Sequence, residues 1–218
     1  MAYQVVCVSR TLGAKGEAVG QTVAQRLGFR YVDEHIISRA AELAQVDPRL
    51  VAAAEHRQPL LQRVLDKLAA AQELVGPLTL TAGIPLDVVV TPEAAGPRTT
   101  PEDARALIRA AIHEVANAGR TVIVAHAASM ALAFAGGVLR VLVTASPETR
   151  ARRVAAANGI PEDAAAATIA ASDRERQGYF RQFYKIRDEL PTHYDVVINT
   201  DVLTPEQAAE VVVVAAGS

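Results

Sequence analysis

A short run of small and charged residues near the N-terminus carries the residue types that bind phosphate. Residues 5–8 read Val-Val-Cys-Val, an apolar and largely β-branched run typical of a central strand. Residues 9–18 follow as Ser-Arg-Thr-Leu-Gly-Ala-Lys-Gly-Glu-Ala and lead into a helical pattern marked by Val19, Val23 and Leu27. The first backbone N–H groups of a helix have no intrahelical partner, so a strand, a tight turn and a helix N-terminus form an anion site. The chemistry that this run predicts is the binding of a phosphate group.

The glycines of this run do not complete either of the common phosphate-binding motifs. Against the Walker A pattern G-x-x-x-x-G-K-[ST], with Gly13 inside the loop, the lysine position holds Gly16 and neither Glu17 nor Ala18 after it supplies the hydroxyl, while Lys15 stands one residue early. The dinucleotide pattern G-x-G-x-x-G also fails, because Gly13, Gly16 and Gly20 are spaced three and four apart. A strand-to-helix turn that needs glycine only for its backbone angles therefore remains an alternative.

Two cations of the run are candidates to replace the missing lysine. The flexible stem of Lys15 allows a one-residue offset, and Arg10 stands where the motif has its first glycine. Each is equally compatible with a solvated surface position. We expect contacts to the phosphates of a nucleotide from Ser9, Arg10, Gly13, Ala14, Lys15, Gly16, Glu17 and Ala18.

The composition narrows the classes of function. At 218 residues and 50% hydrophobic content, the chain is long enough for one substantial domain, with or without a small inserted one. A net charge of −2 gives no overall basic field, so nucleic acid is not an expected partner. No apolar run reaches the roughly 20 residues of a membrane helix. The single cysteine, Cys7, is expected in the core, which suits a reducing cytoplasm, and the scattered histidines predict no structural zinc site.

The elements that must position the phosphate-binding run alternate between strands and helices. Strands are predicted at residues 5–8, 29–32, 121–125, 138–144 and 195–198. Helices are predicted at about 17–27, 34–46, 60–68, 101–118 and 146–158, from 161 onward and from 204. Between Gly76 and Pro101 the periodicity is lost to proline-containing pairs, which predicts an irregular excursion. Strands separated by helices indicate a parallel α/β sheet, and ligands bind beyond the carboxyl ends of such strands, where Ser9, Asp33 and His126 are expected to gather.

Six short motifs, taken in order along the chain, resemble those of a known family. They are Val-Ser-Arg-x-x-Gly-x-x-Gly (8–16), Leu-Gly-Phe-x-Tyr-x-Asp (27–33), Val-Ile-Val (122–124), Ala-Ser-Pro-Glu-x-Arg (145–150), Ser-Asp-Arg-Glu-Arg (172–176) and Ile-Asn-Thr (198–200). Each motif alone is modest, but the ordered set is similar to the cytidylate kinase-like proteins, relatives of bacterial cytidylate kinase among the nucleoside monophosphate kinases.

The resemblance implies a three-layer α/β P-loop kinase fold with a five-stranded parallel sheet in a single domain. Its core would comprise about 1–33, 101–160 and 190–218, with a helical substrate-binding excursion at about 34–100 and an arginine-bearing lid at about 161–189. The implied activity is transfer of the γ-phosphate of ATP to a nucleoside monophosphate or another small acceptor, with Mg²⁺ delivered by the nucleotide.

The resemblance also carries over to particular residues. Asp33 and Arg39 match the D-x-x-x-x-x-R with which cytidylate kinase meets its acceptor nucleotide. The charged lid segment is matched by Asp173, Arg174, Glu175 and Arg176. Arginines there would neutralise the charge that phosphoryl transfer spreads over the equatorial oxygens, so Arg174 and Arg176 are predicted to be catalytic together with Lys15. Asp33, Arg39, His126, Asp173 and Glu175 are predicted to bind the acceptor.

The departures from the family pattern leave other functions open. The family's G-R-G after the third strand is here Ala125-His126-Ala127, which removes an arginine expected to hold the acceptor phosphate. A catalytically impaired module that binds a nucleotide is therefore the first alternative. A dinucleotide-dependent enzyme is the second, because Asp33 lies 20 residues after Gly13, about where a ribose-binding acid would stand.

Overall fold

A computed structural model describes residues 3–33, 101–125 and 128–217 of the chain. The described segments form a five-stranded sheet in the order β2-β3-β1-β4-β5, in which every neighbouring pair is parallel. The strands are β1 (Val5–Arg10), β2 (Arg30–Asp33), β3 (Thr121–Val124), β4 (Val138–Thr144) and β5 (Val196–Asn199). All five lie within one or two residues of the predicted runs. The parallel α/β fold expected from the sequence is confirmed.

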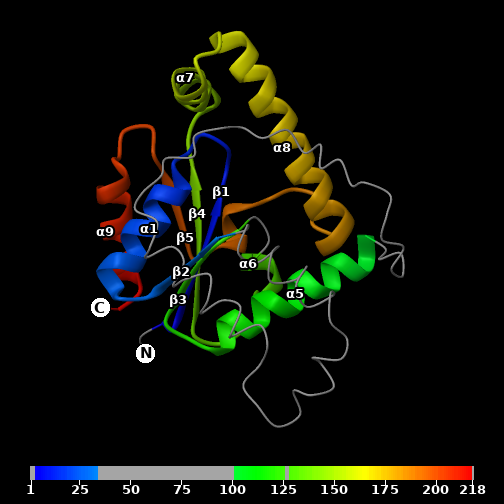
Figure 1. The fold of residues 1–218 in the computed structure, drawn as a ribbon, viewed down its shortest axis with the longest axis vertical. Coiled ribbons are helices and arrows are strands. Elements are labelled where there is room, and N and C mark those ends of the chain that lie inside the picture. The colour runs from blue at the N-terminus through cyan, green and yellow to red at the C-terminus, as the bar shows by residue number, and fades with distance from the viewer. Residues whose placement is uncertain (1–2, 34–100, 126–127, 218) are drawn as a thin grey trace, which may run out of the picture.

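Helices cover both faces of this sheet (Figure 1). The helices are α1 (Gly16–Leu27), α5 (Pro101–Asn117), α6 (Ala128–Ala131), α7 (Pro147–Asn158), α8 (Glu162–Tyr184) and α9 (Pro205–Ala215), with a short 3-10 turn at Pro191–His193. Helices α1 and α9 pack on one face, while α5 and α6 pack on the other. Two of these elements, α6 and the 3-10 turn, were not predicted, since each is too short to show a period.

The central strand β1 explains how the two faces are formed. Side chains of a strand alternate between faces, so Val5 and Cys7 pack with α5 and α6, whereas Val6 and Val8 pack with α1 and α9. Cys7 is fully buried, and burial raises the pKa of its thiol to about 12, so it is a core residue as expected. The strand is apolar on both faces because both are covered by helices.

The helix boundaries follow the capping residues of the sequence. Gly28 ends α1 in the left-handed conformation, with φ 62°, and Gly159 ends α7 in the same way with φ 64°. Ser146 begins α7 by accepting a hydrogen bond from the backbone N–H of Thr149, and Thr204 begins α9 with a reciprocal capping box. These four ends were predicted.

Helices α7 and α8 pair with each other and project beyond the carboxyl edge of the sheet (Figure 1). Ala151 and Val154 of α7 pack on Ala165 and Ile169 of α8. Further along α8, Phe180 returns to the sheet and packs on Leu142 and its neighbours. Within the described residues, no helix combines the length and apolarity that crossing a bilayer requires. The helices predicted at 34–46 and 60–68 and the irregular excursion lie outside the described residues.

Candidate functional site

The candidate site is the loop that joins β1 to α1 at the carboxyl edge of the sheet. Helix α1 begins at Gly16, so the N–H groups of Gly16, Glu17 and Ala18 belong to its first turn and lack intrahelical acceptors. Lys15 is the N-cap residue and adopts a left-handed conformation with φ 62°, and Gly13 has φ 80°. These two left-handed residues turn the strand directly into the helix, as the glycine pattern predicts.

Side chains from later parts of the chain hold the carbonyl oxygens of this loop. The four hydrogen bonds run from Arg176 Nη1 to the Arg10 carbonyl (3.0 Å), Arg150 Nη1 to Leu12 (3.5 Å), Arg153 Nη1 to Gly13 (3.4 Å) and Thr200 Oγ1 to Ala14 (2.9 Å). In a trans peptide the C=O and the following N–H point in opposite directions. The N–H groups of Gly13 and Lys15 therefore face away from the donors that hold Leu12 and Ala14. The N–H of Ala14 donates to the Thr11 carbonyl at 3.1 Å, so an anion would meet the N–H groups of Gly13, Lys15 and the first turn of α1.

The two glycines of the loop have no room for a side chain. A Cβ atom added to Gly13 would lie 2.9 Å from the backbone oxygen of Arg150, and its positive φ disfavours other residues. A Cβ atom added to Gly16 would lie 2.5 Å from Cβ of Arg10. Both glycines are fixed by close packing, and Gly13 also by its backbone angle.

The side chain of Arg10 lies over Gly16 and ends at the first turn of α1. Its Nε forms an ion pair with Oε1 of Glu17, and only 17% of the side chain is exposed. Tyr31 of β2 is close by, since its pKa is raised by burial and by the charges of Asp33 and Glu17, and lowered in part by Arg10. Asp33, which pairs in register with Val124 of β3 at the carboxyl end of β2, and Arg10 thus both act on Tyr31.

The surroundings of Lys15 differ from those of Arg10. It is exposed, and its charge helps to lower the pKa of Glu206 on α9, after the hydrogen bonds that Glu206 receives from its own backbone and from Thr204. The charge of Lys15 thus acts on α9, whereas that of Arg10 acts on Tyr31 of β2.

Arg176 of α8 is buried against the end of β1. Its Nε and Nη2 donate to the two carboxylate oxygens of Glu189, at 2.7 and 2.6 Å, and Nη2 also donates to Ser9 Oγ at 2.9 Å. The Tyr194 hydroxyl donates to the same Glu189 carboxylate and lies 3.3 Å from Ser9 Oγ. Burial alone would raise the pKa of Glu189, but the hydrogen bonds and charge of Arg176 outweigh it and hold that pKa below its ordinary value. We call Ser9, Arg176, Glu189 and Tyr194 the arginine lock.

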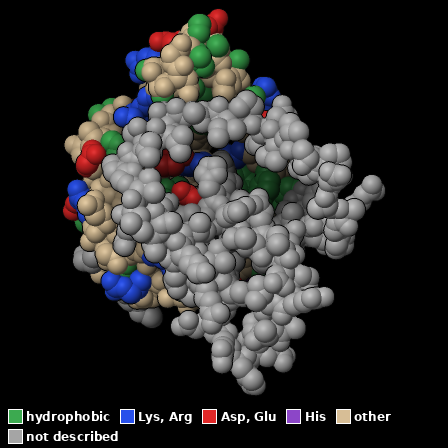
Figure 2. All heavy atoms as spheres, viewed as in Figure 1, with side chains coloured by type: hydrophobic (Ala, Val, Ile, Leu, Met, Phe, Trp, Pro, Cys, Tyr) green, Lys and Arg blue, Asp and Glu red, His purple; other side chains and the backbone are tan. Residues whose placement is uncertain are grey.

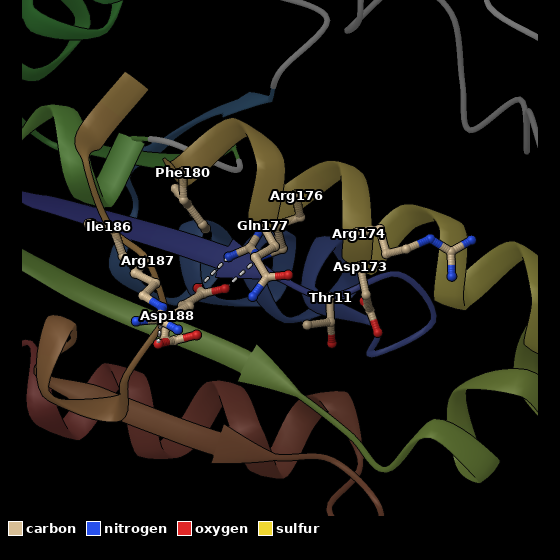
Figure 3. A pocket seen from close by; sticks show the side chains of 10 residues that line it. Thr11, Asp173, Arg174, Arg176, Gln177, Phe180, Ile186, Arg187 and Asp188 are labelled. Carbon is tan, nitrogen blue, oxygen red and sulfur yellow. Dashed lines mark hydrogen bonds and ion pairs between the residues drawn. The ribbon is translucent and has the colours of Figure 1, made fainter. Parts of the chain in front are cut away.

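A cavity of about 410 Å³ lies beside the arginine lock. Thr11 of the loop, Asp173, Arg174 and Arg176 of α8, and Arg187 line it (Figure 3). Arg174 is exposed and points away from Arg176 (Figure 3). Acidic and basic side chains are visible next to each other in the middle of the face in Figure 2, below the projecting α7 and α8. The cavity therefore lies between Thr11 of the loop and arginine side chains of α8.

The predicted site residues are only partly brought together. The loop residues and Arg176 share one edge, and Asp173 reaches that edge through a two-bonded ion pair with Arg150, at 2.9 and 2.7 Å. Ser9 is buried within the arginine lock, so its hydroxyl faces Arg176. Glu175 is exposed on α8. Arg39 and His126 lie outside the described residues, and the roles predicted for all of these residues stay predictions.

Sequence reasoning did not assign a role to Arg150, Arg153 or Thr200. The arginine-rich helix after Ser146 and the Ile-Asn-Thr at 198–200 were both noticed as family motifs. Nothing in their spacing shows that they reach loop carbonyls more than 130 positions earlier in the chain. The only available signal was that both motifs follow strands predicted to end at the same edge of the sheet.

Comparisons with known proteins agree with this architecture. The sequence matches the cytidylate kinase-like family over residues 5–202, whereas a search of curated proteins finds no significant match. An uncharacterized protein from Eubacterium ventriosum ATCC 27560 superposes with a TM-score of 0.64 at 13% identity, covering 98% of both chains. Shikimate kinase from Bacteroides thetaiotaomicron superposes with a TM-score of 0.50 at 15% identity, covering 97% of both chains. At these identities the solved structures show that the fold is shared.

Proposed function

Because this chain belongs to the cytidylate kinase-like family over residues 5–202, we propose that it transfers the γ-phosphate of ATP to a nucleoside monophosphate or another small acceptor. The observation that carries the proposal is the loop between β1 and α1, whose carbonyls at Arg10, Leu12, Gly13 and Ala14 are all held by donors from elsewhere in the chain. A backbone fixed in this way presents N–H groups to the phosphates without needing any side chain of the loop.

The other parts of the reaction follow from what surrounds the loop. Mg²⁺ bound to ATP would neutralise the β and γ phosphates. Arg174 lines the cavity beside the loop and is exposed, so in this proposal it is the arginine that approaches the transferring phosphate. Asp33, at the end of β2, would meet the acceptor on the other side of the loop, with Arg39 and His126 as the further acceptor contacts that the family resemblance implies.

The reaction is expected to be slow for a kinase. Position 16 has no lysine and position 18 has no hydroxyl, so the chain lacks the ammonium group of the motif and one direct ligand of Mg²⁺. Loss of one preorganised charge-stabilising group typically costs about 3 to 4 kcal/mol of barrier, or roughly a hundred- to a thousandfold in rate. Nucleotide binding depends on the backbone and is expected to suffer less.

A second candidate is a module that binds a nucleotide without efficient turnover. The observation that favours it is the arginine lock, since the guanidinium of Arg176 is already engaged by Glu189 and Ser9. Saturable binding of Mg·ATP without phosphate transfer to any acceptor would support this candidate over the kinase.

Binding at the loop is tested with a matched pair of glycine variants. Gly13→Ala forces a Cβ against the Arg150 carbonyl at a positive φ, whereas Gly136→Ala adds a Cβ with no other atom within 4 Å. Strain of this kind costs about 1 to 3 kcal/mol, so Mg·ATP binding is expected to weaken by about 10- to 100-fold in Gly13→Ala and to stay unchanged in Gly136→Ala. Calorimetry measures the affinities, and circular dichroism with thermal melting checks that both variants fold.

The type of ligand and the acceptor are tested separately. Thermal-shift measurements with ATP, NAD and nucleoside monophosphates, each with and without Mg²⁺, report which ligand binds the folded state. A coupled assay then compares CMP, the other monophosphates and shikimate as acceptors. The absence of saturable ATP binding at millimolar concentration would overturn the proposal, and a midpoint raised by NAD alone would favour the dinucleotide-dependent alternative.

A further inference from the structure

We propose that Arg10 takes the part that a lysine at position 16 would have, binding the outer phosphates of the nucleotide, and that Glu17 is the counter-ion that pairs with Arg10. The inference rests on the proposed function and deepens it, because it names the cation of the phosphate site. It also ranks Arg10 above Lys15 for that role.

The space above Gly16 is filled by the side chain of Arg10. A Cβ atom on Gly16 would lie 2.5 Å from Cβ, 3.1 Å from Cδ and 3.3 Å from Cγ of Arg10. The arginine stem therefore passes through the volume in which the side chain of a lysine at position 16 would begin. A side chain at position 16 therefore conflicts with the arginine at position 10, and the closest contact, between the two Cβ atoms, is relieved only by glycine at position 10.

The charged end of Arg10 is at the place where the phosphates would bind. Its Nε pairs with Glu17, which is in the first turn of α1, the turn that supplies the helix N–H groups. A guanidinium has five N–H donors in a planar fork that suits phosphate oxygens. Because the side chain is 17% exposed and its stem is held against Gly16, little conformational freedom is left to lose when it binds.

Lys15 lacks these features. Its side chain is exposed, and its charge acts on Glu206 of α9 rather than on the Glu17 and Tyr31 side of the loop. Its own backbone is fixed in the left-handed conformation as the N-cap residue of α1. An exposed lysine has more conformational freedom to lose on binding phosphates than Arg10, whose stem is held against Gly16.

A charge-swap experiment tests the inference. The probe is inorganic tripolyphosphate, which reports phosphate contacts alone, and calorimetry measures its affinity for the full chain. Arg10→Gly removes the cation and is expected to weaken binding by about 10- to 100-fold. Gly16→Lys alone is also expected to weaken binding, because its Cβ would meet Arg10 Cβ at 2.5 Å. The double variant Arg10→Gly with Gly16→Lys vacates that space and restores a cation, so binding is expected to return to within about fivefold of wild type.

Controls separate this inference from the proposed function and from misfolding. Arg26→Gln removes an exposed cation at the far end of α1 and serves as the matched charge control. Arg10→Gln keeps most of the stem over Gly16 and is expected to weaken binding as Arg10→Gly does, which covers the case that the glycine variant does not fold. If wild type binds neither ATP nor tripolyphosphate, the proposed function itself fails.

Two results would overturn the inference while leaving the proposed function intact. The first is wild-type binding that Lys15→Gln weakens as much as, or more than, Arg10→Gly. The second is a folded double variant that binds tripolyphosphate as weakly as Arg10→Gly. In either case Arg10 would be a packing residue above Gly16.

Discussion

Replacing Arg176 by methionine tests whether this arginine is a structural or a catalytic residue. The change keeps a similar apolar stem but removes both hydrogen bonds to Glu189, the bond to Ser9 Oγ and the bond to the Arg10 carbonyl. Glu189, whose side chain is only 20% exposed, would then hold an uncompensated charge. Breaking a buried ion pair costs about 3 to 5 kcal/mol, and we take the lower end because Glu189 keeps some contact with water.

The expected loss converts into a measurable shift of melting temperature. For a domain of this size, each kcal/mol corresponds to about 2 to 4 °C, so Arg176→Met should melt about 6 to 12 °C below wild type. Adding Glu189→Gln removes the unpaired charge, and the double variant should recover part of that loss. Circular dichroism melts of wild type, both single variants and the double variant complete the thermodynamic cycle.

The pH dependence gives an independent check on the same pair. The pKa of Glu189 is lowered in the folded protein, so the stability from this carboxylate is fully present above its unfolded pKa of about 4.5 and is lost as pH falls through the folded value. The difference in melting temperature between wild type and Arg176→Met should therefore shrink below about pH 4.5. A shift under 1 °C at pH 7 together with abolished phosphate transfer would refute the structural reading and restore Arg176 as a catalytic residue.

Two further substitutions probe the loop. Thr200→Val deletes the hydroxyl that donates to the Ala14 carbonyl and accepts from Arg153 Nη1 at 3.1 Å. Because Thr200 is fully buried, we expect the free energy of unfolding to fall by about 1 to 3 kcal/mol and nucleotide binding to weaken. Thr200→Ser keeps the hydroxyl and should retain both stability and binding. Denaturant unfolding measures the stability and calorimetry measures the nucleotide affinity. Valine and serine variants with equal stability and equal affinity would show that the hydroxyl does not hold the loop. Lys15→Gly should be more stable than Lys15→Ala by about 1 kcal/mol, because position 15 has φ 62° and only glycine adopts it without strain. Thermal unfolding of the two variants measures this difference. An alanine variant as stable as the glycine variant would contradict the left-handed conformation of residue 15.

Local signals predicted the elements of the fold well. Gly28, Ser146, Gly159 and Thr204 end or begin helices where their conformational and capping preferences place them. The apolar β-branched runs became strands because both faces of the sheet are covered. Helix α6 could not be predicted, since the four residues Ala128–Ala131 form little more than one turn and display no hydrophobic period.

The site was less accessible to sequence reasoning because its interactions join distant positions. The loop glycines predict a phosphate site, but the choice between Lys15 and Arg10 depends on which side chain passes over Gly16. That contact joins the end of β1 to the first residue of α1 and depends on how the loop folds back between them. Likewise, the pairing of Arg176 with Glu189 depends on how the chain returns from α8 to β5, which no local pattern encodes.

The four held carbonyls have a consequence for how the loop tolerates change. Their donors come from α7, from α8 and from the residue after β5, so the shape of the loop is specified mainly outside its own sequence. Substitution of a loop side chain other than Gly13 or Gly16 is therefore expected to change the loop backbone little. This is consistent with a loop that has the backbone turn without the lysine and hydroxyl of the motif. The same arrangement means that a ribosome must synthesise the chain as far as Thr200 before the loop can adopt its final conformation. It also means that grafting residues 9–18 alone onto another strand and helix would not transfer the anion site.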